Sequence, residues 1–397
     1  MPFFSYFSMH ISPLTLFGLI LLLGLIGGEI TRLVRFIPRI SGYIAVGFLV
    51  GPSVFDIINP SLLVDIRLFV DIALGLILFD LGRQLDFTWL RHDPSIIYMS
   101  LAESSFTFIL VFGTLSLLGI STTTASMAAV IAIISSPAVI ILVTNDLSSE
   151  GPVTRRTLIL TSLNNLIGLT LFTLLLPLAK VNTAANVSSF AFYIHKLGGA
   201  LGLGLSIFLV ALILGAVIGK RKESQFVLFV GLALLTISLA KVFHLSIMLS
   251  LFVFGVAARN FDYKHVLIEV DFAWSARLFF IIMFVVTGIQ LNVQGFTTST
   301  LVILSFVLMR FLAKTAGVWL FAKKSRLTKQ QTAAISLALT PMSGFSIGMA
   351  MTLLEVNPIL GQQLIMIITS AATVLHTFGP ILTQYALLRT DEALTNN

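Results

Sequence analysis

The chain has 397 residues, of which 57% are hydrophobic and 10% charged, and its mean hydropathy is +1.03. This composition excludes an ordinary soluble domain, in which about a quarter of the residues carry charge. The net charge of +7 sits in clusters without interleaved aromatic residues, which argues against nucleic-acid binding, and the absence of cysteine excludes disulfides, iron–sulfur clusters and thiolate zinc sites.

Apolar stretches recur along almost the whole chain. A hydrocarbon core about 30 Å thick requires roughly 20 apolar residues per helix, so we predict an all-α integral membrane protein with about thirteen transmembrane helices. Residues 1–397 are expected to form a single transmembrane domain, with a membrane region from about residue 12 to 388 and no soluble regulatory domain. The predicted helices are 12–31, 41–58, 64–85, 95–119, 123–145, 155–180, 189–219, 226–243, 245–259, 272–290, 298–322, 331–354 and 363–388.

Lysine and arginine residues concentrate in every second connection between these helices. By the positive-inside rule, basic connections lie on the cytoplasmic side. The alternation predicts a multi-pass protein of the cell membrane with its N-terminus outside and its C-terminus in the cytoplasm. The basic clusters are Arg32/Arg35/Arg39, Arg83/Arg91, Arg155/Arg156, Lys220/Arg221/Lys222, Arg259/Lys264, Lys323/Lys324/Arg326/Lys329 and Arg389.

Two predicted helices are interrupted near mid-span. The fifth contains Ser135-Ser136-Pro137, and the twelfth contains the segment Thr340 to Gly344, with Pro341 and Ser343. Proline removes a backbone donor, and serine and threonine re-satisfy unwound backbone, so both segments are candidate helix breaks. The two helices lie seven apart in the predicted order, so they run in opposite directions. This pattern predicts inverted repeats with two broken helices that cross at a binding site. Ordinary proline kinks are the alternative.

Several polar groups are expected at the depth of these breaks. Asn164 and Asn165 lie about ten residues into the sixth predicted helix, or ~15 Å deep. Lys314 in the eleventh helix shares a face with Arg310, and an ammonium at this depth costs at least ~3 kcal/mol unless it is paired, hydrated or deprotonated. The alternatives are that the amides join neighbouring helices and that both cations bind backbone carbonyls.

Glu103, in the fourth predicted helix, has no cation close to it in sequence. We expect it to face a water-filled cavity, and Glu103 and Lys314 are the candidate proton carriers. His376 in the last helix is expected to be a packing residue. Motifs for metal ligation, nucleophilic catalysis or phosphate binding are missing from the sequence, so we predict neither an enzyme nor a bound cofactor.

Three hydrophobic segments have an order and spacing that are specific when taken together: Arg39 to Ser53, Leu74 to Asp86 and Leu278 to Leu291. Together they resemble the monovalent cation/proton antiporters, most closely the bacterial branch with thirteen spans. The resemblance covers nearly the whole membrane region and implies a secondary transporter, possible homodimers, and small ions, protons and the lipid bilayer as partners.

The chain departs from that family at residues that matter chemically. Asn165 occupies the position of an aspartate that alternately binds cation and proton, Ser135-Ser136 replaces Thr-Asp or Ser-Thr, and Gly344 stands where a glutamate is frequent. Lys314 falls close to the family's basic residue, with Arg310 as an alternative alignment. An amide does not exchange a proton near neutral pH, so another group must titrate or the substrate must differ.

Three functions remain open at this point. The first is Na⁺ or K⁺ exchange for protons by alternating access. The second keeps the fold but carries an organic or inorganic anion, as bile-acid-type carriers do, and the third is a transport-dead relative that acts as a sensor or assembly partner. The predicted ion- or substrate-binding residues are Ser135, Ser136, Asn164, Asn165, Lys314, Thr340 and Ser343.

Overall fold

The computed structural model describes residues 13–33, 37–58, 67–179, 186–267, 277–291, 295–390 and 392. Within these ranges the regular secondary structure is entirely helical. The first twelve residues, Arg35, and the connecting residues 59–66 and 292–294, which enter the topology prediction, lie outside the described residues. The helices are α2 (Pro13–Arg32), α3 (Arg39–Val50), α4 (Arg67–Arg83), α5 (Phe87–His92), α6 (Ser95–Leu117), α7 (Thr122–Ile133), α8 (Pro137–Asp146), α9 (Pro152–Leu175), η2 (Leu176–Ala179), α10 (Asn186–Ile218), α11 (Lys222–Val242), α12 (Ile247–Asn260), α14 (Arg277–Ile289), α15 (Gly295–Phe321), α16 (Lys329–Ala338), α17 (Phe345–Val356) and α18 (Pro358–Leu388).

The observed helices confirm the predicted all-α membrane architecture. Every predicted transmembrane segment contains an α-helix, and the fifth and twelfth contain two each. With α7 and α8 taken together, 8 helices among the described residues are long and apolar enough to cross a membrane, and shorter apolar helices accompany them. The protein is therefore a multi-pass membrane protein.

One helix end differs clearly from its prediction. The second helix was expected to run to residue 58, but α3 ends at Val50. Pro52 has no N–H to continue the helix. The chain folds back instead, with the N–H of Asp56 donating to the Gly51 carbonyl (2.9 Å) and the N–H of Ile58 to the Val50 carbonyl (2.9 Å).

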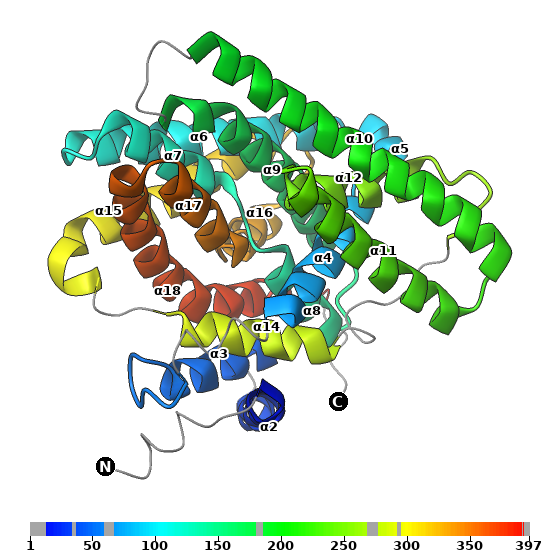
Figure 1. The fold of residues 1–397 in the computed structure, drawn as a ribbon. Helices are drawn as coiled ribbons and strands as arrows, with labels where there is room; N and C mark the ends of the chain where they lie inside the picture. Colours follow the sequence, from blue (N-terminus) through cyan, green and yellow to red (C-terminus); the bar gives the residue numbers. More distant parts are fainter. Residues whose placement is uncertain are drawn as a thin grey trace.

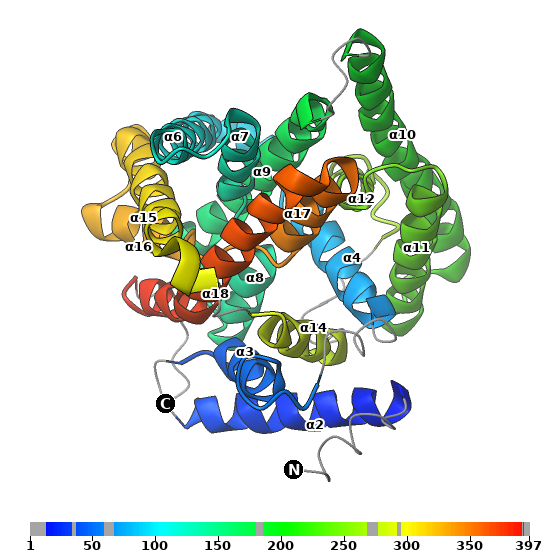
Figure 2. The same cartoon turned by 60° about the vertical axis from the view of Figure 1, so that its left-hand side comes forward.

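The helices form two bundles that lie against each other (Figure 1, Figure 2). The core bundle contains α6 to α9 and α15 to α18, with α6 packed along α15 and α18 packed on α16 and α17. The flanking bundle contains α2, α3, α4, α10, α11, α12 and α14, with α3 between α2 and α14 and α4 against α12. Both interrupted helices belong to the core bundle.

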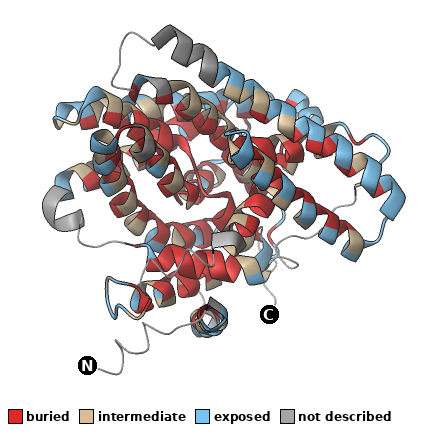
Figure 3. Ribbon diagram, viewed as in Figure 1, coloured by how far each residue is buried: buried red, intermediate tan, exposed pale blue. Residues whose placement is uncertain are grey.

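Burial follows the requirements of a lipid environment. Figure 3 shows buried residues gathered where the helices meet and exposed residues along the outward faces of peripheral helices such as α10. Large apolar side chains lie on these outward faces, including Leu209 and Val217 on α10 and Leu308 on α15. Hydrocarbon chains solvate such residues as well as a protein interior does, so they need no cover.

Two helix crossings in the flanking bundle depend on glycine. A Cβ atom added to Gly47 of α3 would lie 2.1 Å from the Val285 carbonyl oxygen of α14. One added to Gly255 of α12 would lie 2.0 Å from the Phe79 carbonyl oxygen of α4. The backbones therefore touch directly at both crossings, as small residues allow in membrane helices.

Replacing Gly255 with alanine is expected to lower the melting temperature of the purified protein by several degrees. The new methyl group would overlap the Phe79 carbonyl and force α4 and α12 apart, and overpacking of this kind costs about 1–3 kcal/mol. Gly231 on α11 is the matched control, because an added Cβ there has nothing within 4 Å. Equal melting temperatures for the Gly255→Ala and Gly231→Ala proteins would contradict the direct backbone contact.

Candidate functional site

The two interrupted helices meet inside the core bundle. The first break lies between Ile133 at the end of α7 and Pro137 at the start of α8, and the second between Ala338 of α16 and Phe345 of α17. The N–H of Ser136 donates to the Pro341 carbonyl (2.9 Å), and the Ser135 hydroxyl donates to the Leu339 carbonyl (3.0 Å). The breaks therefore cross, which confirms the prediction of two broken crossing helices.

Local chemistry explains why the first break falls where it does. Pro137 occupies the first turn of α8, where its missing N–H has no cost. The Ser136 hydroxyl caps α8 by accepting from the N–H of Val139 (3.4 Å). The residues that interrupt α7 thus also begin α8.

Arg310 of α15 joins the two breaks. Its guanidinium donates to the Ala132 and Ile134 carbonyls (2.9 Å each) at the end of α7, and to the Thr340 (2.5 Å) and Pro341 (3.3 Å) carbonyls after α16. The last carbonyl groups of a helix lack partners within it and carry partial negative charge. The alternative in which Arg310 binds backbone carbonyls is confirmed.

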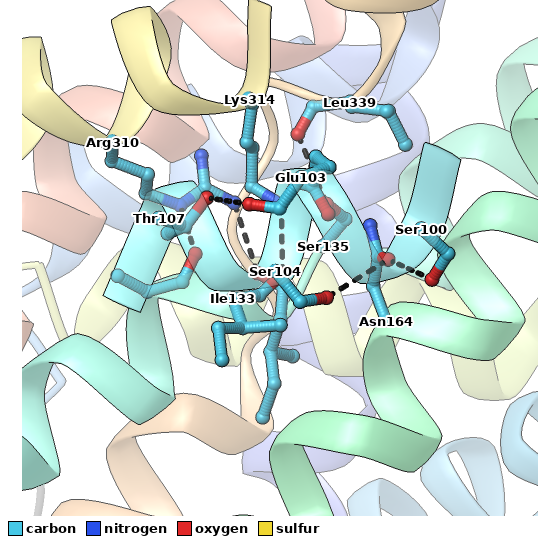
Figure 4. A network of polar contacts seen from close by, with 12 residues as sticks. Ser100, Glu103, Ser104, Thr107, Ile133, Ser135, Asn164, Arg310, Lys314 and Leu339 are labelled. Atoms are coloured by element: carbon cyan, nitrogen blue, oxygen red, sulfur yellow. Dashed lines mark hydrogen bonds and ion pairs between the residues drawn. The ribbon is translucent and has the colours of Figure 1, made fainter. Parts of the chain in front are cut away.

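Lys314, one turn further along α15, lies in an ion pair with Glu103 of α6 (Figure 4). Its ammonium also donates to the Ile133 carbonyl (2.7 Å) at the end of α7. The side chains of Lys314 and Glu103 are 1% and 0% exposed. The expectation that Glu103 faces a water-filled cavity was wrong, because a cation 211 positions away in sequence covers it.

Asn164 and Asn165 of α9 face different partners. The Asn164 carbonyl accepts from the hydroxyls of Ser100 (2.7 Å) and Ser104 (3.4 Å) on α6. The Asn165 amide nitrogen donates to the carbonyls of Ser135 (2.9 Å) and Thr161 (2.7 Å). Both asparagines are fully buried, and among the described residues the Asn165 Oδ1 atom has no hydrogen-bond partner.

The remaining predicted residues lie at the second break. Thr340 contributes a carbonyl to Arg310, and its own hydroxyl finds no partner in the described part of the chain. Ser343 is 3% exposed and lines a small cavity beside both breaks. The structure therefore brings all the predicted site residues to the crossing.

Sequence reasoning named Glu103 but missed the rest of the polar face of α6. Ser100 and Ser104 lie four residues apart, as do Glu103 and Thr107, which places the four on one side of a helix. Ser100, Glu103 and Ser104 are hydrogen-bonded or ion-paired to other helices in the site. That spacing was the available signal.

A larger cavity of about 1030 Å³ opens at the end of the bundle that carries basic clusters. It reaches Leu158 and Ile159 on α9, close to Thr161 and Ser162 on the next turn. Charged residues of both signs line it: Asp80, Arg83, Asp86, Glu150, Arg155, Arg156 and Arg259.

Two carboxylates near this cavity are held in their ionised form. Burial alone would raise the pKa of Asp86, but hydrogen bonds, including one from Arg259 (2.9 Å), lower it below its ordinary value. Burial likewise opposes ionisation of Asp93, yet the bonds from Ser95 and Arg156 lower its pKa. These pairs fix the connections outside the membrane helices.

The arrangement presents groups that can bind an ion. It presents uncharged oxygens, backbone carbonyls and one buried ion pair, and among the described residues no cluster of His, Cys, Asp or Glu could hold a metal. Broken helices that cross in a membrane bundle, with buried charges at the crossing, define a secondary transporter.

The family model for the transmembrane sodium/hydrogen exchangers matches residues 5–387. The chain belongs to this family, whose members are transporters and not enzymes.

Solved structures show the same fold. The chain is similar to the sodium/proton antiporter MjNhaP1 from Methanocaldococcus jannaschii at pH 8, with 20% identity, 95% of each chain covered and a TM-score of 0.69. An electron-microscopy map of MjNhaP1 gives a TM-score of 0.70 at the same identity and coverage. A search of curated protein sequences found no match.

Replacing Arg310 with methionine is expected to destabilise the protein strongly. The change leaves four carbonyls without their buried donor, and each unsatisfied group costs about 1–3 kcal/mol. Arg310→Lys should recover part of the loss, since an ammonium reaches fewer carbonyls. Thermal unfolding of the purified protein measures this, with Lys323→Met at an exposed position as the control. Equal melting temperatures for the Arg310→Met and Lys323→Met proteins would refute the role of Arg310.

Proposed function

We propose that the protein is a secondary active transporter that exchanges a monovalent cation, Na⁺ or K⁺, for protons by alternating access. Membership of the sodium/hydrogen exchanger family and the fold shared with a sodium/proton antiporter support this proposal. The observation that carries it is the buried ion pair between Glu103 and Lys314 at the crossing of the broken helices.

The ion pair supplies the chemistry that Asn165 cannot. An amide has no ionisable proton near neutral pH, so cation and proton do not compete for Asn165. In the empty site the Lys314 ammonium neutralises Glu103. When a cation enters, Lys314 releases a proton and the cation becomes the positive partner of the carboxylate. One cation then replaces one proton, and the net charge of the site stays the same.

Buried oxygens complete the proposed cation site. Oδ1 of Asn165, the hydroxyl of Thr161 and Oε2 of Glu103 are buried and, among the described residues, have no hydrogen-bond partner. Unwound carbonyls and the C-terminal ends of half-helices coordinate Na⁺ in other transporters. The other residues that we propose as cation ligands are Ser135, Ser136, Asn164, Thr340 and Ser343.

Many transporters that work by alternating access are built from two structurally related halves, and the glycine crossings support inverted repeats in this chain. Gly47 of α3 contacts the carbonyl of Val285, which lies three residues before Gly288 of α14. Gly255 of α12 contacts the carbonyl of Phe79, which lies three residues before Gly82 of α4. If α3 corresponds to α12 and α14 corresponds to α4, the crossing of α3 with α14 is equivalent to the crossing of α12 with α4. The related helices lie seven apart in the predicted order, as the two breaks do.

The basic clusters support an orientation with the C-terminus and the larger cavity in the cytoplasm. The cavity would then give cytoplasmic ions access to α9. We propose the cell membrane as the location and a homodimer as the assembly, the latter by resemblance to the antiporter family.

Anion transport is the second candidate, and the four arginines that line the larger cavity favour it: Arg83, Arg155, Arg156 and Arg259. At the crossing, however, backbone carbonyls bind the Arg310 guanidinium and Glu103 pairs with Lys314. Neither cation is left for an anion. Proton flux in vesicles, measured with Na⁺, K⁺, Li⁺ and organic anions in turn, distinguishes these functions from a transport-dead sensor.

Asn165→Asp is expected to strengthen pH-dependent cation exchange. The new carboxylate would lie against the Ser135 carbonyl and the first break, where it adds a titratable ligand. The same change at the exposed Asn145 is the control, because it adds a carboxylate away from the crossing. Exchange rates in vesicles between about pH 5 and pH 8 that are equal for the Asn165→Asp and Asn145→Asp proteins would argue against this site.

Lys314→Ala is expected to abolish proton-coupled exchange, since the proposed proton carrier is lost and Glu103 remains buried without its cation. Glu103 is the anionic partner of Lys314 in the ion pair. Glu103→Gln should reduce exchange by at least about tenfold, or ~1.4 kcal/mol. Rates in vesicles measure both changes. Full activity in either variant would show that the pair is structural.

A further inference from the structure

His376 of α18 lies beside the helix breaks and lines the same cavity as Ser136 and Ser343. Gly379 lies on the next turn of α18 and packs closely against Pro341. A Cβ atom added to Gly379 would lie 2.8 Å from the Cα atom of Pro341. The His376 side chain is 1% exposed, and neither ring nitrogen forms a hydrogen bond within the described residues. A buried polar group in this condition costs about 1–3 kcal/mol. A buried imidazole therefore calls for a water molecule or a ligand beside it.

A cavity beside His376 has room for such a partner. Its volume of about 60 Å³ can hold roughly two water molecules. Ser136 and Ser343 line it where the two breaks cross, and Thr287 of α14 and Gln290, the residue that follows α14, also line it. Among the residues that line the cavity, Gln290 is exposed.

The polar groups around this cavity suit water. The Thr287 hydroxyl donates to the Met283 carbonyl (2.8 Å) and keeps lone pairs that can accept from a water molecule. Among the residues that line the cavity, His376 is the one with an ionisable side chain. An unperturbed imidazole gains and loses its proton within the physiological pH range.

We propose that this cavity is a hydrated proton-binding site in which His376 takes up and releases a proton. Neutral imidazole accepts a proton from hydronium in the cavity and returns it to water. The inference deepens the proposed exchange function and rests on it, because it adds a proton-binding residue beside the Glu103–Lys314 pair.

The charged group that acts on His376 is Arg310 of α15. The four carbonyls that Arg310 binds offset its charge. The polar groups that line the cavity from the other elements are uncharged: Ser136 on the α8 side, Ser343 beside α17, Thr287 on α14 and Gln290 directly after α14.

Cysteine labelling tests hydration without relying on transport, since the natural chain contains 0 cysteines. Thr287→Cys places a thiol in the cavity wall, and Val285→Cys places one on the same helix at a position with 0% exposure that does not line the cavity. Methyl methanethiosulfonate should label the first at least about tenfold faster than the second. Equal rates would overturn the proposal.

The labelling rate of a second, cationic reagent reports the charge of His376. Aminoethyl methanethiosulfonate is cationic, so a protonated imidazole should slow its reaction with Thr287→Cys, while the neutral reagent responds only to ionisation of the thiol. The ratio of cationic to neutral rates is expected to fall several-fold from about pH 8 to about pH 5. The ratio should become independent of pH when His376→Gln is added. A ratio that is constant with His376 present, or that falls equally with His376→Gln, would overturn the proposal.

Failure of this inference is distinguishable from failure of the proposed function. Labelling is measured on protein that need not transport, so absent exchange in vesicles would refute the function alone. If His376→Gln does not fold, as judged by gel filtration, the pH dependence at Thr287→Cys compared with that at Val285→Cys decides the question.

Discussion

The guanidinium of Arg310 is the contact on which the membrane site depends. Interrupting two helices inside a bilayer leaves carbonyl groups that no water can reach, and each costs free energy unless a donor is supplied. Arg310 supplies donors to both breaks at once through four carbonyls. Because one planar group binds both segments, it also holds them in register, with the hydroxyl of Ser135 against Leu339 and the N–H of Ser136 against Pro341.

The second buried cation has a different partner and therefore a different role. Lys314 pairs directly with a carboxylate as well as binding a carbonyl, whereas the guanidinium of Arg310 donates its hydrogen bonds to backbone carbonyls. Guanidinium stays charged at all physiological pH values, but a buried lysine can lose its proton. Arg310 therefore carries a permanent charge that supports the structure, whereas Lys314 carries a charge that can be lost with its proton. Under the proposed exchange, Lys314 would supply the proton that the amide of Asn165 cannot release.

The sequence predicted the breaks and their crossing because their causes are local. Pro137 and Pro341 remove donors, and the neighbouring hydroxyls re-satisfy the backbone. The pairing of Glu103 with Lys314 could not be predicted, since 211 positions separate the residues and nothing in either helix indicates its partner. The end of α3 was missed because an apolar run obscured the stop at Gly51 and Pro52. His376 looked like a packing residue, since a sequence does not show whether a buried ring has a partner.

Both members of the ion pair belong to the core bundle, on α6 and α15, and this has an electrical consequence. If the core bundle moves as one body, the carboxylate and its positive partner cross the membrane field together. A charge that crosses the whole field does work of about 2.3 kcal/mol per 100 mV. When a cation takes the place of the released proton, the moving body carries the same charge in its loaded and empty states. The membrane potential then acts equally on the outward and return movements and drives no net exchange, so the direction of transport follows from the two concentration gradients alone.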